Sequence, residues 1–484
     1  MADKPIIAVL LERLPERCVL HDAEDLRPYE CDGLSAYRSM PLAVVIPENV
    51  EQARLALQLC AQHAVPVVAR GAGTGLSGGA LPLADGISLS MARFNRILDI
   101  DVANRVARVQ PGVTNLSIST AAEPHGLYYA PDPSSQIACS IGGNVAENAG
   151  GVHCLKYGLT THNIQALEIL TMDGEHMTIG SAALDAPGFD LLALLTGSEG
   201  LLGVITEVTV KLLPRPETAQ VVLAAFASVD AAGAAVTAVI ASGIIPAGLE
   251  LLDRPAIHAV EQFIDAGYPA DATAILLCEL DGSSVDVGVQ IEHVNRVFRD
   301  AGATELKVSQ NEAERQRFWA GRKSAFPAMG RLSPDYYCMD GTIPRKHLAR
   351  VLNRIETLSD EYGLPICNVF HAGDGNLHPL ILYDANRPGE LERAEELGGL
   401  ILETCVAVGG TITGEHGVGM EKINQMCVQF NTAELEQFHR VKDAFDPAGL
   451  LNPGKAIPTL HRCAEFGAMH VHEGQLPHPE LERF

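Results

Sequence analysis

A glycine-dense stretch, Gly71-Ala-Gly-Thr-Gly-Leu-Ser-Gly-Gly79, restricts the possible folds of this chain more than any other feature. An apolar run at 65–69 precedes it and predicts a buried strand that leads into the glycines. A Rossmann fold would need a helix immediately afterwards, but Gly79 and Pro82 stand where its first turns should be. Because glycine allows positive φ and close approach, we expect a loop whose N–H groups surround an anion such as a phosphate. The alternative is a glycine-rich turn in a tightly packed domain.

A second glycine cluster lies at 140–151, after the rigid turn Pro131-Asp-Pro-Ser-Ser135. Two clusters in one domain suit a long, flat ligand that needs the backbone close along its length, which favours a dinucleotide cofactor. Strands are expected at 164–171 and at 203–213, and in the second of these apolar and polar residues alternate. At Leu213-Pro-Arg-Pro216 the glycine clusters fade and an Ala/Val-rich alternation of helices and strands begins, which predicts a domain boundary.

The charge balance excludes some classes of protein. Lys and Arg total 35 against 60 for Asp and Glu, which gives a formal net charge of −25 over 484 residues. Such a chain lacks the basic footprint of a nucleic-acid binder and the basic patch that docks on anionic lipid. We interpret the acidic excess as a contribution to solubility. The length itself predicts two to four domains of about 100–200 residues.

The hydropathy and the cysteines predict an intracellular protein. No apolar run approaches the ~20 residues that span a bilayer, and the apolar stretch at 5–11 is too short for a secretory signal. The eleven cysteines are scattered, odd in number and never spaced C-x-x-C. That spacing offers neither a zinc knuckle nor an iron–sulfur motif, so most thiols are expected to be reduced and buried.

Two histidines flank a tight turn in His371-Ala-Gly-Asp-Gly-Asn-Leu-His378, where apolar runs on both sides predict a strand and its returning partner. Further along, Gly409-Gly-Thr-Ile-Thr-Gly-Glu-His-Gly417 presents Glu415 and His416 on a glycine-flanked loop. Two imidazoles and a carboxylate match a divalent metal site with open positions, and Zn²⁺ or Mn²⁺ accepts such mixed ligands. The alternative is that these histidines are packed in a core or hydrogen-bonded at the surface.

Several motifs together resemble the vanillyl-alcohol oxidase/p-cresol methylhydroxylase family of FAD proteins. The resemblance rests on the loop at 70–79, Pro131-Asp-Pro133, Gly142-Gly-Asn144, Tyr157-Gly158, Thr196-Gly-Ser-Glu-Gly200 and Gly203-Val-Ile-Thr206. Residues 220–455 resemble the C-terminal half of the FAD-linked oxidases. Within the family, the chain is most similar to the catalytic subunits of bacterial glycolate oxidases, with D-lactate and D-2-hydroxyglutarate dehydrogenases as near relatives.

The resemblance implies an α+β fold: a two-part FAD-binding domain of the p-cresol methylhydroxylase type, an α+β substrate domain, and a C-terminal tail that returns to the flavin. We therefore place an N-terminal segment at 1–40, the FAD domain at 41–216, the substrate domain with its metal site at 217–440 and the returning segment at 441–484. It also implies non-covalent FAD, although His153 and Cys154 are residue types that carry FAD covalently elsewhere in the family. The residues expected to contact FAD are Arg70, Gly71, Gly73, Thr74, Gly75, Leu76, Ser77, Gly78, Pro131, Asp132, Ser140, Gly142, Gly143, Asn144, Glu199, Gly200, Gly203, Ile205 and Asn452.

The resemblance also implies roles at the second site. It places Zn²⁺ or Mn²⁺ on His371, His378 and Glu415, uses His416 as the base, and uses Arg322 to bind the substrate carboxylate. A metal there would lower the pKa of a 2-hydroxy acid's hydroxyl group, and a neutral His416 would take its proton. FAD would accept the hydride from C2. Taken alone, Arg322 could equally be an arginine paired on a helix surface.

One stretch departs from the 2-hydroxyglutarate relatives, which carry extra polar and basic groups after this arginine. Here the corresponding positions supply Phe326 and Cys338 instead. The change disfavours a dicarboxylate and fits glycolate or D-lactate. The single tryptophan, Trp319, is expected in the core.

Reduced FAD needs an electron acceptor, and the chain has no second redox motif. The resemblance implies a second flavin-domain subunit and an iron–sulfur subunit that passes electrons to quinone, and hence a cytoplasmic protein held peripherally at the membrane through its partners. The alternatives are a D-lactate or other D-2-hydroxy-acid dehydrogenase acting alone, the same fold acting on another alcohol or as an oxidase that uses O₂, and a flavin-carrying scaffold without chemistry. The histidine-rich tail from His461 would suit an interface or a solvated surface.

Overall fold

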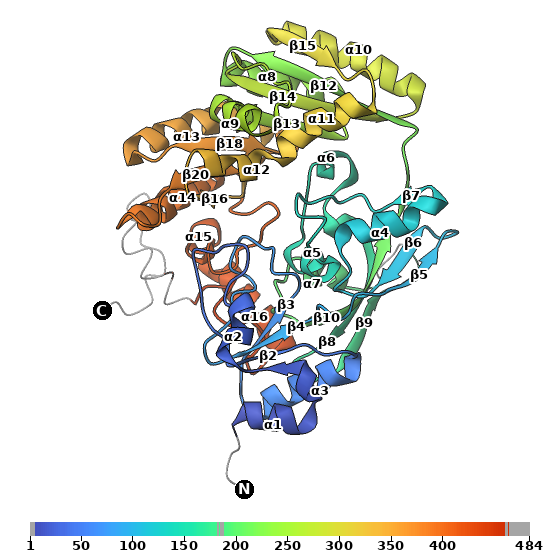
Figure 1. Cartoon of the computed structure of the whole chain (residues 1–484), viewed down its shortest axis with the longest axis vertical. Helices are drawn as coiled ribbons and strands as arrows, with labels where there is room; N and C mark the ends of the chain where they lie inside the picture. The colour runs from blue at the N-terminus through green and yellow to red at the C-terminus, as the bar shows by residue number, and fades with distance from the viewer. Residues whose placement is uncertain (1–4, 182, 184–187, 460–462, 464–484) are drawn as a thin grey trace. The chain divides into compact units, whose positions relative to one another are not determined.

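The chain passes four times between two compact units in the computed structural model, which describes residues 5–181, 183, 188–459 and 463 (Figure 1). Unit 1 comprises Met1–Gly150, Leu159–Pro214 and Glu415–Phe484, whereas unit 2 comprises Gly151–Gly158 and Arg215–Gly414. The crossing after Pro214 lies two residues from the sequence boundary placed at 216. The short return at 151–158 and the crossing after Gly414 have no counterpart among the boundaries drawn from the sequence.

Unit 1 contains a four-stranded sheet in the order β1-β2-β4-β3. Its strands are β1 (Val19–Leu20), β2 (Ala43–Val45), β3 (Val67–Arg70) and β4 (Ile87–Ser90). Strands β2, β4 and β3 are parallel, and β1 runs antiparallel to β2. Helices α1 (Ile6–Arg13) and α3 (Val50–Gln62) bury apolar residues such as Leu10 and Leu57 in the same core as this sheet. Asn49 caps α3 by accepting from the Gln52 backbone N–H.

A five-stranded antiparallel sheet, β5-β6-β10-β8-β9, completes the β structure of this unit together with the short pair β7 (Leu127–Tyr128) and β11 (Leu213–Pro214). Its strands are β5 (Ile97–Asp101), β6 (Val106–Val109), β8 (Ile164–Leu170), β9 (His176–Gly180) and β10 (Val204–Lys211). Residues along β10 alternate between buried and half-buried, as the sequence alternation predicts. Helices α4 (Asn115–Ala122), α5 (Ile141–Glu147) and α7 (Leu191–Leu195) share a core with this sheet.

The C-terminal segment returns to unit 1 through α15 (Ile423–Gln429) and α16 (Thr432–Phe445), earlier in the chain than the segment from 441 that the resemblance implied. The Val67 N–H of β3 donates to the Leu450 carbonyl at 2.8 Å, and the Asn452 N–H donates to the Val67 carbonyl at 2.8 Å. Cys427 and Cys463 form a disulfide, while the other nine cysteines are free thiols, so the expectation that most are reduced is confirmed. The remaining histidine-rich tail lies outside the described residues.

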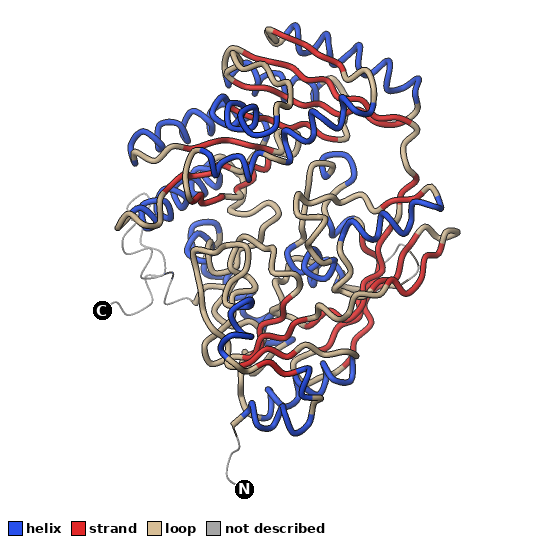
Figure 2. The backbone as a smooth tube through the Cα atoms, viewed as in Figure 1, coloured by secondary structure: helices blue, strands red, loops and turns tan. Residues whose placement is uncertain are grey.

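Unit 2 is built on a seven-stranded antiparallel sheet in the order β15-β12-β14-β13-β18-β20-β16. The strands are β12 (Thr218–Phe226), β13 (Gly248–Asp253), β14 (Ala274–Gly282), β15 (Glu305–Val308), β16 (Asp335–Cys338), β18 (Ile366–Phe370) and β20 (Pro379–Tyr383), with a small pair β17 (Gly341–Thr342) and β19 (Asn376–Leu377) beside them. Figure 2 shows this alternation of strands with helices, which the Ala/Val-rich texture after 216 predicts.

Helices cover both faces of this sheet. On one face, α9 (Arg254–Ile264), α11 (Glu312–Lys323) and α12 (Ala325–Ala328) share a core with alternate residues of the central strands, and Trp319 lies in that core as expected. On the other face, Phe298 of α10 (Ser284–Asp300) packs edge-on against Phe226 of β12. Helices α8 (Val229–Ala241), α13 (Leu348–Tyr362) and α14 (Glu390–Ala407) complete the unit.

The short segment 151–158, which includes α6 (Cys154–Tyr157), is held to β14 by two buried acids. Asp281 accepts from the Tyr157 hydroxyl at 2.7 Å and pairs with Lys156. Glu279 lies 3.1 Å from His153 Nε2 and accepts from Arg315 at 2.8 Å and from the Trp319 indole. We call Glu279, His153, Arg315 and Trp319 the Glu279 cluster. Burial alone would raise the pKa of Glu279, but its contacts with His153, Arg315 and Trp319 lower that pKa to about 2.

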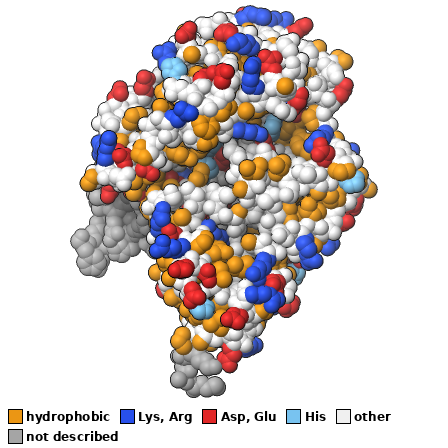
Figure 3. All heavy atoms as spheres, viewed as in Figure 1, with side chains coloured by type: hydrophobic (Ala, Val, Ile, Leu, Met, Phe, Trp, Pro, Cys, Tyr) orange, Lys and Arg blue, Asp and Glu red, His pale blue; other side chains and the backbone are white. Residues whose placement is uncertain are grey.

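The surface carries both signs of charge. On the face drawn in Figure 3, Lys and Arg side chains are interspersed with Asp and Glu. Within the part of the chain that the structure describes, no helix is both long and apolar enough to cross a membrane.

Candidate active site

The first glycine stretch is a loop, as predicted. Residues 71–86 follow β3 and contain neither helix nor strand. Gly73 and Gly78 have φ of 73° and 75°, a region that residues with a side chain rarely adopt. A Cβ on Gly75 would meet no protein atom within 4 Å, so the space in front of this backbone is open. The loop therefore has room for a ligand group beside its backbone.

The second glycine cluster begins a helix and touches the first. Ser140 caps α5 by accepting from the Gly143 N–H at 3.3 Å. A Cβ on Gly71 would strike the Ser140 hydroxyl, so glycine is required where the loop meets the helix. Asn115, which sequence reasoning missed, donates to Asn144 at 3.1 Å and to the Pro131 carbonyl at 3.0 Å. It joins the predicted 131–133 turn to α5.

The returning C-terminal segment meets the same region. The Asn452 amide donates to the Gly79 carbonyl at 3.0 Å and to the Glu199 carbonyl at 2.7 Å. Lys455 also donates to the Gly79 carbonyl at 3.0 Å, and burial lowers its pKa to about 8. The Glu199 carboxylate accepts from the backbone N–H of Gly419 at 2.6 Å. The glycine loop, the segments around Glu199 and Gly419, and the segment 452–455 are distant in sequence but thus come together within unit 1.

The remaining residues predicted to contact FAD divide by role. Arg70 donates through Nη1 to the Ala80 carbonyl at 3.5 Å, and its guanidinium lies 5.6 Å from the centre of the Tyr29 ring, so it contacts the loop backbone. Gly142 and Gly203 are packed against Pro111 and Ile169, so a side chain at either position would collide with the domain itself. The hydroxyl of buried Ser77 has no hydrogen-bond partner among the described residues. An unpaired buried hydroxyl beside open backbone fits a polar ligand such as the FAD pyrophosphate.

A buried acid that the sequence did not indicate lies in this region. A Cβ on Gly79 would lie 2.8 Å from the Glu147 carboxyl, and Glu147 also lies against Gly417 of the returning segment. Burial and the charge of Glu199 raise the pKa of Glu147 well above its usual range.

In unit 2, one buried carboxylate joins the predicted carboxylate-binding arginine to one of the predicted metal ligands. Arg322 of α11 donates through Nε to Glu250 Oε2 at 2.7 Å, and His371 Nδ1 lies 2.9 Å from Glu250 Oε1. All three side chains are at most 4% exposed. Burial alone would raise the pKa of Glu250, but His371 and Arg322 lower it overall, so the carboxylate is charged and accepts from both. Arg322 Nη2 is buried and has no partner among the described residues.

The two histidines of the turn motif lie together. His371 directly follows β18 and His378 directly precedes β20, so the expected strand pair places both at one end of the sheet. Their ring centroids are 5.1 Å apart and the rings are nearly perpendicular, at 84°. Gly375 in the turn has φ of 88°, and a Cβ there would strike the Ile343 carbonyl. The turn therefore requires glycine where the sequence has it.

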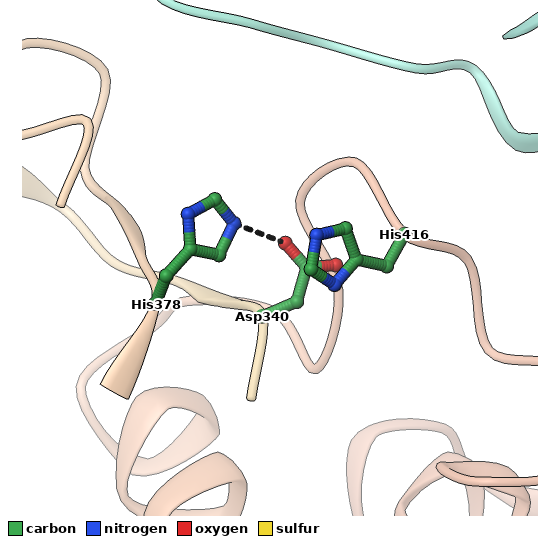
Figure 4. A group of neighbouring side chains, drawn as sticks. All are labelled: Asp340, His378 and His416. Atoms are coloured by element: carbon green, nitrogen blue, oxygen red, sulfur yellow. Dashed lines mark ion pairs between the residues drawn. The ribbon is translucent and has the colours of Figure 1, made fainter. Parts of the chain in front are cut away.

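A second carboxylate, Asp340, holds the loop that leads to Glu415 and His416. Asp340 accepts from the Thr413 hydroxyl at 2.6 Å and from the Gly414 N–H at 3.0 Å. Its other oxygen lies 3.4 Å from His378 Nε2, the ion pair drawn in Figure 4 together with His416. Glu415 and His416 follow Gly414 directly, so the hydrogen bonds from Thr413 and Gly414 to Asp340 fix the backbone immediately before them.

The donor set fits a divalent cation. His371, His378 and Glu415 each offer a ligand atom, and these atoms lie within 4.8 Å of one another. Asp340, His378 and His416 form a second such group. Nitrogen and carboxylate oxygen at this spacing suit Zn²⁺ or Mn²⁺. Asp340, which sequence reasoning did not include, is already engaged by Thr413 and Gly414.

Apolar side chains border the histidines. The Phe326 ring lies 6.4 Å from that of His378, and Cys338 is buried in the core beside it. These are the two positions at which the sequence departs from the 2-hydroxyglutarate relatives.

Family comparisons agree with this geometry. Residues 41–180 match the FAD binding domain family, and residues 215–456 match the family of C-terminal domains of FAD linked oxidases. The solved structure of p-cresol methylhydroxylase with substrate bound matches with a TM-score of 0.78 at 17% identity, covering 94% of this chain and 97% of that one. The protein is thus an FAD-dependent oxidoreductase of the p-cresol methylhydroxylase-type fold, as the sequence predicted.

Sequence relatives identify the family to which the chain belongs within this class. The chain is 67% identical over 479 residues to glycolate oxidase subunit GlcD of Escherichia coli (strain K12), covering 99% of this chain and 96% of that protein. It is 30% identical to a D-lactate dehydrogenase of Anaerostipes hadrus, covering 92% of this chain and 95% of that protein. The chain belongs to the glycolate oxidase GlcD and D-lactate dehydrogenase family, whose members oxidise 2-hydroxy acids with FAD.

Proposed function

We propose that this protein oxidises glycolate to glyoxylate, and D-lactate to pyruvate as a second substrate, within a multi-subunit complex. The observation that carries the proposal is Nη2 of Arg322, which is buried at the Glu250–His371 pair and has no hydrogen-bond partner among the described residues. A buried guanidinium with a free N–H is suited to a substrate carboxylate. The 67% identity to a glycolate oxidase subunit supports glycolate as that substrate.

Each residue of the site then has a role. Arg322 binds the substrate carboxylate and orients C2, and neutral His416 takes the proton from the C2 hydroxyl. A divalent Zn²⁺ or Mn²⁺ on His371, His378 and Glu415 would supply a Lewis acid that lowers the pKa of that hydroxyl. FAD, held non-covalently by the glycine loop and α5, supplies the acceptor for the C2 hydride.

The apolar border favours a short acid. Phe326 and Cys338 offer no charged donor for a second carboxylate. A dicarboxylate would therefore place one charge against apolar side chains without a partner, which is costly. The expected order of preference places glycolate and D-lactate ahead of D-2-hydroxyglutarate.

The test is anaerobic bleaching of the flavin absorbance by these three acids, added separately to the purified chain. Glycolate and D-lactate should reduce the flavin, and the dicarboxylate should do so far more slowly. Equal rates for all three acids would show that the apolar border does not select the substrate. Flavin that none of them reduces would contradict the proposal and favour a scaffold subunit. Release of intact FAD by acid checks that it is non-covalent.

Electrons then leave to partner subunits. We infer a second flavin-domain subunit and an iron–sulfur subunit that carry them to quinone, because a relative is named as a subunit and this sequence has no second redox motif. The isolated chain should reduce an artificial dye much faster than it makes hydrogen peroxide. Rapid, stoichiometric peroxide formation would identify an oxidase that uses O₂ instead.

A further inference from the structure

Glu250 is a fully buried acid whose two oxygens serve different residues. Oε2 accepts from Arg322 and Oε1 accepts from His371, at 2.7 and 2.9 Å. Glu250 has no exposed surface. An acid that is shared between two functional groups can fix the orientation of both at once.

The fold sets this arrangement through strand pairing. Leu251 of β13 is paired with Phe370 of β18, so Glu250 and His371 occupy the next positions in the same antiparallel register. The Gly373 N–H, in the turn after His371, donates to the Leu249 carbonyl at 2.9 Å and extends the pairing. Arg322 reaches Glu250 from α11, which covers this face of the sheet.

The two hydrogen bonds have chemical consequences. A charged carboxylate on Nδ1 keeps the proton on that nitrogen, so Nε2 of His371 presents its lone pair, as a metal ligand must. On the other side, Nε of Arg322 is occupied by Glu250, which leaves Nη2 as the free donor. The same acid also offsets the arginine's charge, which would otherwise be buried alone.

We propose that Glu250 is a positioning residue that couples the metal ligand His371 to the carboxylate-binding Arg322. The inference rests on the proposed function, because it takes the roles of these two residues from there. Glu250 touches neither substrate nor cofactor in this scheme. It fixes the tautomer of His371 and the orientation of the Arg322 guanidinium.

The experiment compares E250Q with E279Q in the full-length, FAD-loaded chain. A glutamine at 250 still accepts from His371, but it turns an N–H towards Arg322 Nε, so it must disturb at least one partner. E279Q is the matched control, since Glu279 also joins a histidine to an arginine of α11. Two quantities are measured after chelator treatment: the affinity for Zn²⁺ or Mn²⁺ alone, by calorimetry, and KM for glycolate after the metal is restored.

The expected result is a metal affinity about 10–100-fold weaker in E250Q, as for other residues that orient a metal ligand, with a raised KM. E279Q should keep both values, although its thermal stability falls. A purely structural role would lower the stability of both variants and move neither value. E250Q with wild-type metal affinity and wild-type KM would overturn the inference.

Three further variants keep the outcomes distinct. If E250Q does not fold, E250D keeps the charge but is too short to reach both partners, so at least one of the two values must change, and no change refutes the inference. H371A and R322A test the proposed function itself. If H371A binds metal normally and R322A has a normal KM, the proposed function is wrong. If both are impaired while E250Q is not, only the role of Glu250 is wrong.

Discussion

Unit 2 contains two similar carboxylate clusters whose arginines differ. Glu250 of β13 and Glu279 of β14 each pair with a histidine and with an arginine of α11. Arg315 and Arg322 are seven residues apart, about two helical turns, so both extend from one side of the helix. Both carboxyl pKa values are lowered by these contacts despite burial.

The difference lies in the arginines. Arg315 is 23% exposed and also binds Glu312 with both Nε and Nη2, so its cluster is complete within the protein. Arg322 is 1% exposed and retains an N–H without a partner among the described residues. The same three residue types thus occur in two settings: each nitrogen of the Arg315 guanidinium has a carboxylate partner, whereas Nη2 of Arg322 has none among the described residues.

Metal removal should give the largest difference in turnover between variants of the two clusters. A chelator should abolish turnover while FAD stays bound, and added Mn²⁺ or Zn²⁺ should restore it. H371A should behave like the stripped enzyme and should not recover with metal, because it lacks a ligand. H153A, the matching histidine of the Glu279 cluster, should recover like the wild type. Full turnover of H371A in metal-free buffer would remove the metal from the mechanism.

The second prediction concerns the base. H416A should lower kcat by about 10²–10⁴-fold, the usual contribution of a general base, with a smaller change in KM. H153A should leave kcat essentially unchanged, because His153 joins a structural cluster. Steady-state kinetics with an artificial dye as acceptor measures both. A nearly normal kcat in H416A would assign proton removal to another group.

The third prediction separates the two arginines. R322A should raise KM for glycolate roughly 10- to 100-fold, the loss expected for hydrogen bonds between a charged donor and a carboxylate. A smaller fall in kcat is also expected, because the bound carboxylate orients C2. R315A should lower the unfolding temperature and leave KM unchanged. The same kinetic pattern in both variants would show that the leftover donor of Arg322 is not what binds substrate.

The smallest expected effect is on stability at low pH. Folding lowers the pKa of Glu279 from 4.5 to about 2, so the charged form stabilises the native state above pH 4.5. That contribution, at most about 3 kcal/mol, is lost as the pH falls from 4.5 towards 2. Urea unfolding of wild type and E279Q at several pH values should show the difference between them shrinking over this range. A constant difference would mean that Glu279 is not charged in the native protein.

The sequence predicted the local parts of this structure well. The strands expected at 65–69, 164–171 and 203–213 and the loop without a following helix at 71–79 all follow from local patterns. The turn between His371 and His378 was also visible, because glycine at Gly375 and apolar flanks leave few other structures.

What the sequence did not reveal depends on contacts between distant residues. Glu250 and Glu279 each interrupt an apolar strand, and a charge inside such a strand was a signal that could have marked both as buried acids. Their partners could not be read, since Glu250 lies 121 residues from His371 and Glu279 lies 126 from His153. For the same reason nothing local indicated that 151–158 belongs to unit 2.

The pairing of β3 with the far end of the chain has a consequence for synthesis. Val67 exchanges backbone hydrogen bonds with Leu450 and Asn452, more than 380 residues later. The N-terminal residues leave the ribosome long before those partners are synthesised. The β3 edge of the first sheet therefore stays unpaired until translation is almost finished. Contacts this distant in sequence are slow to form and leave apolar strands exposed meanwhile. A nascent chain stalled before residue 450 should therefore bind chaperones more strongly than the completed protein.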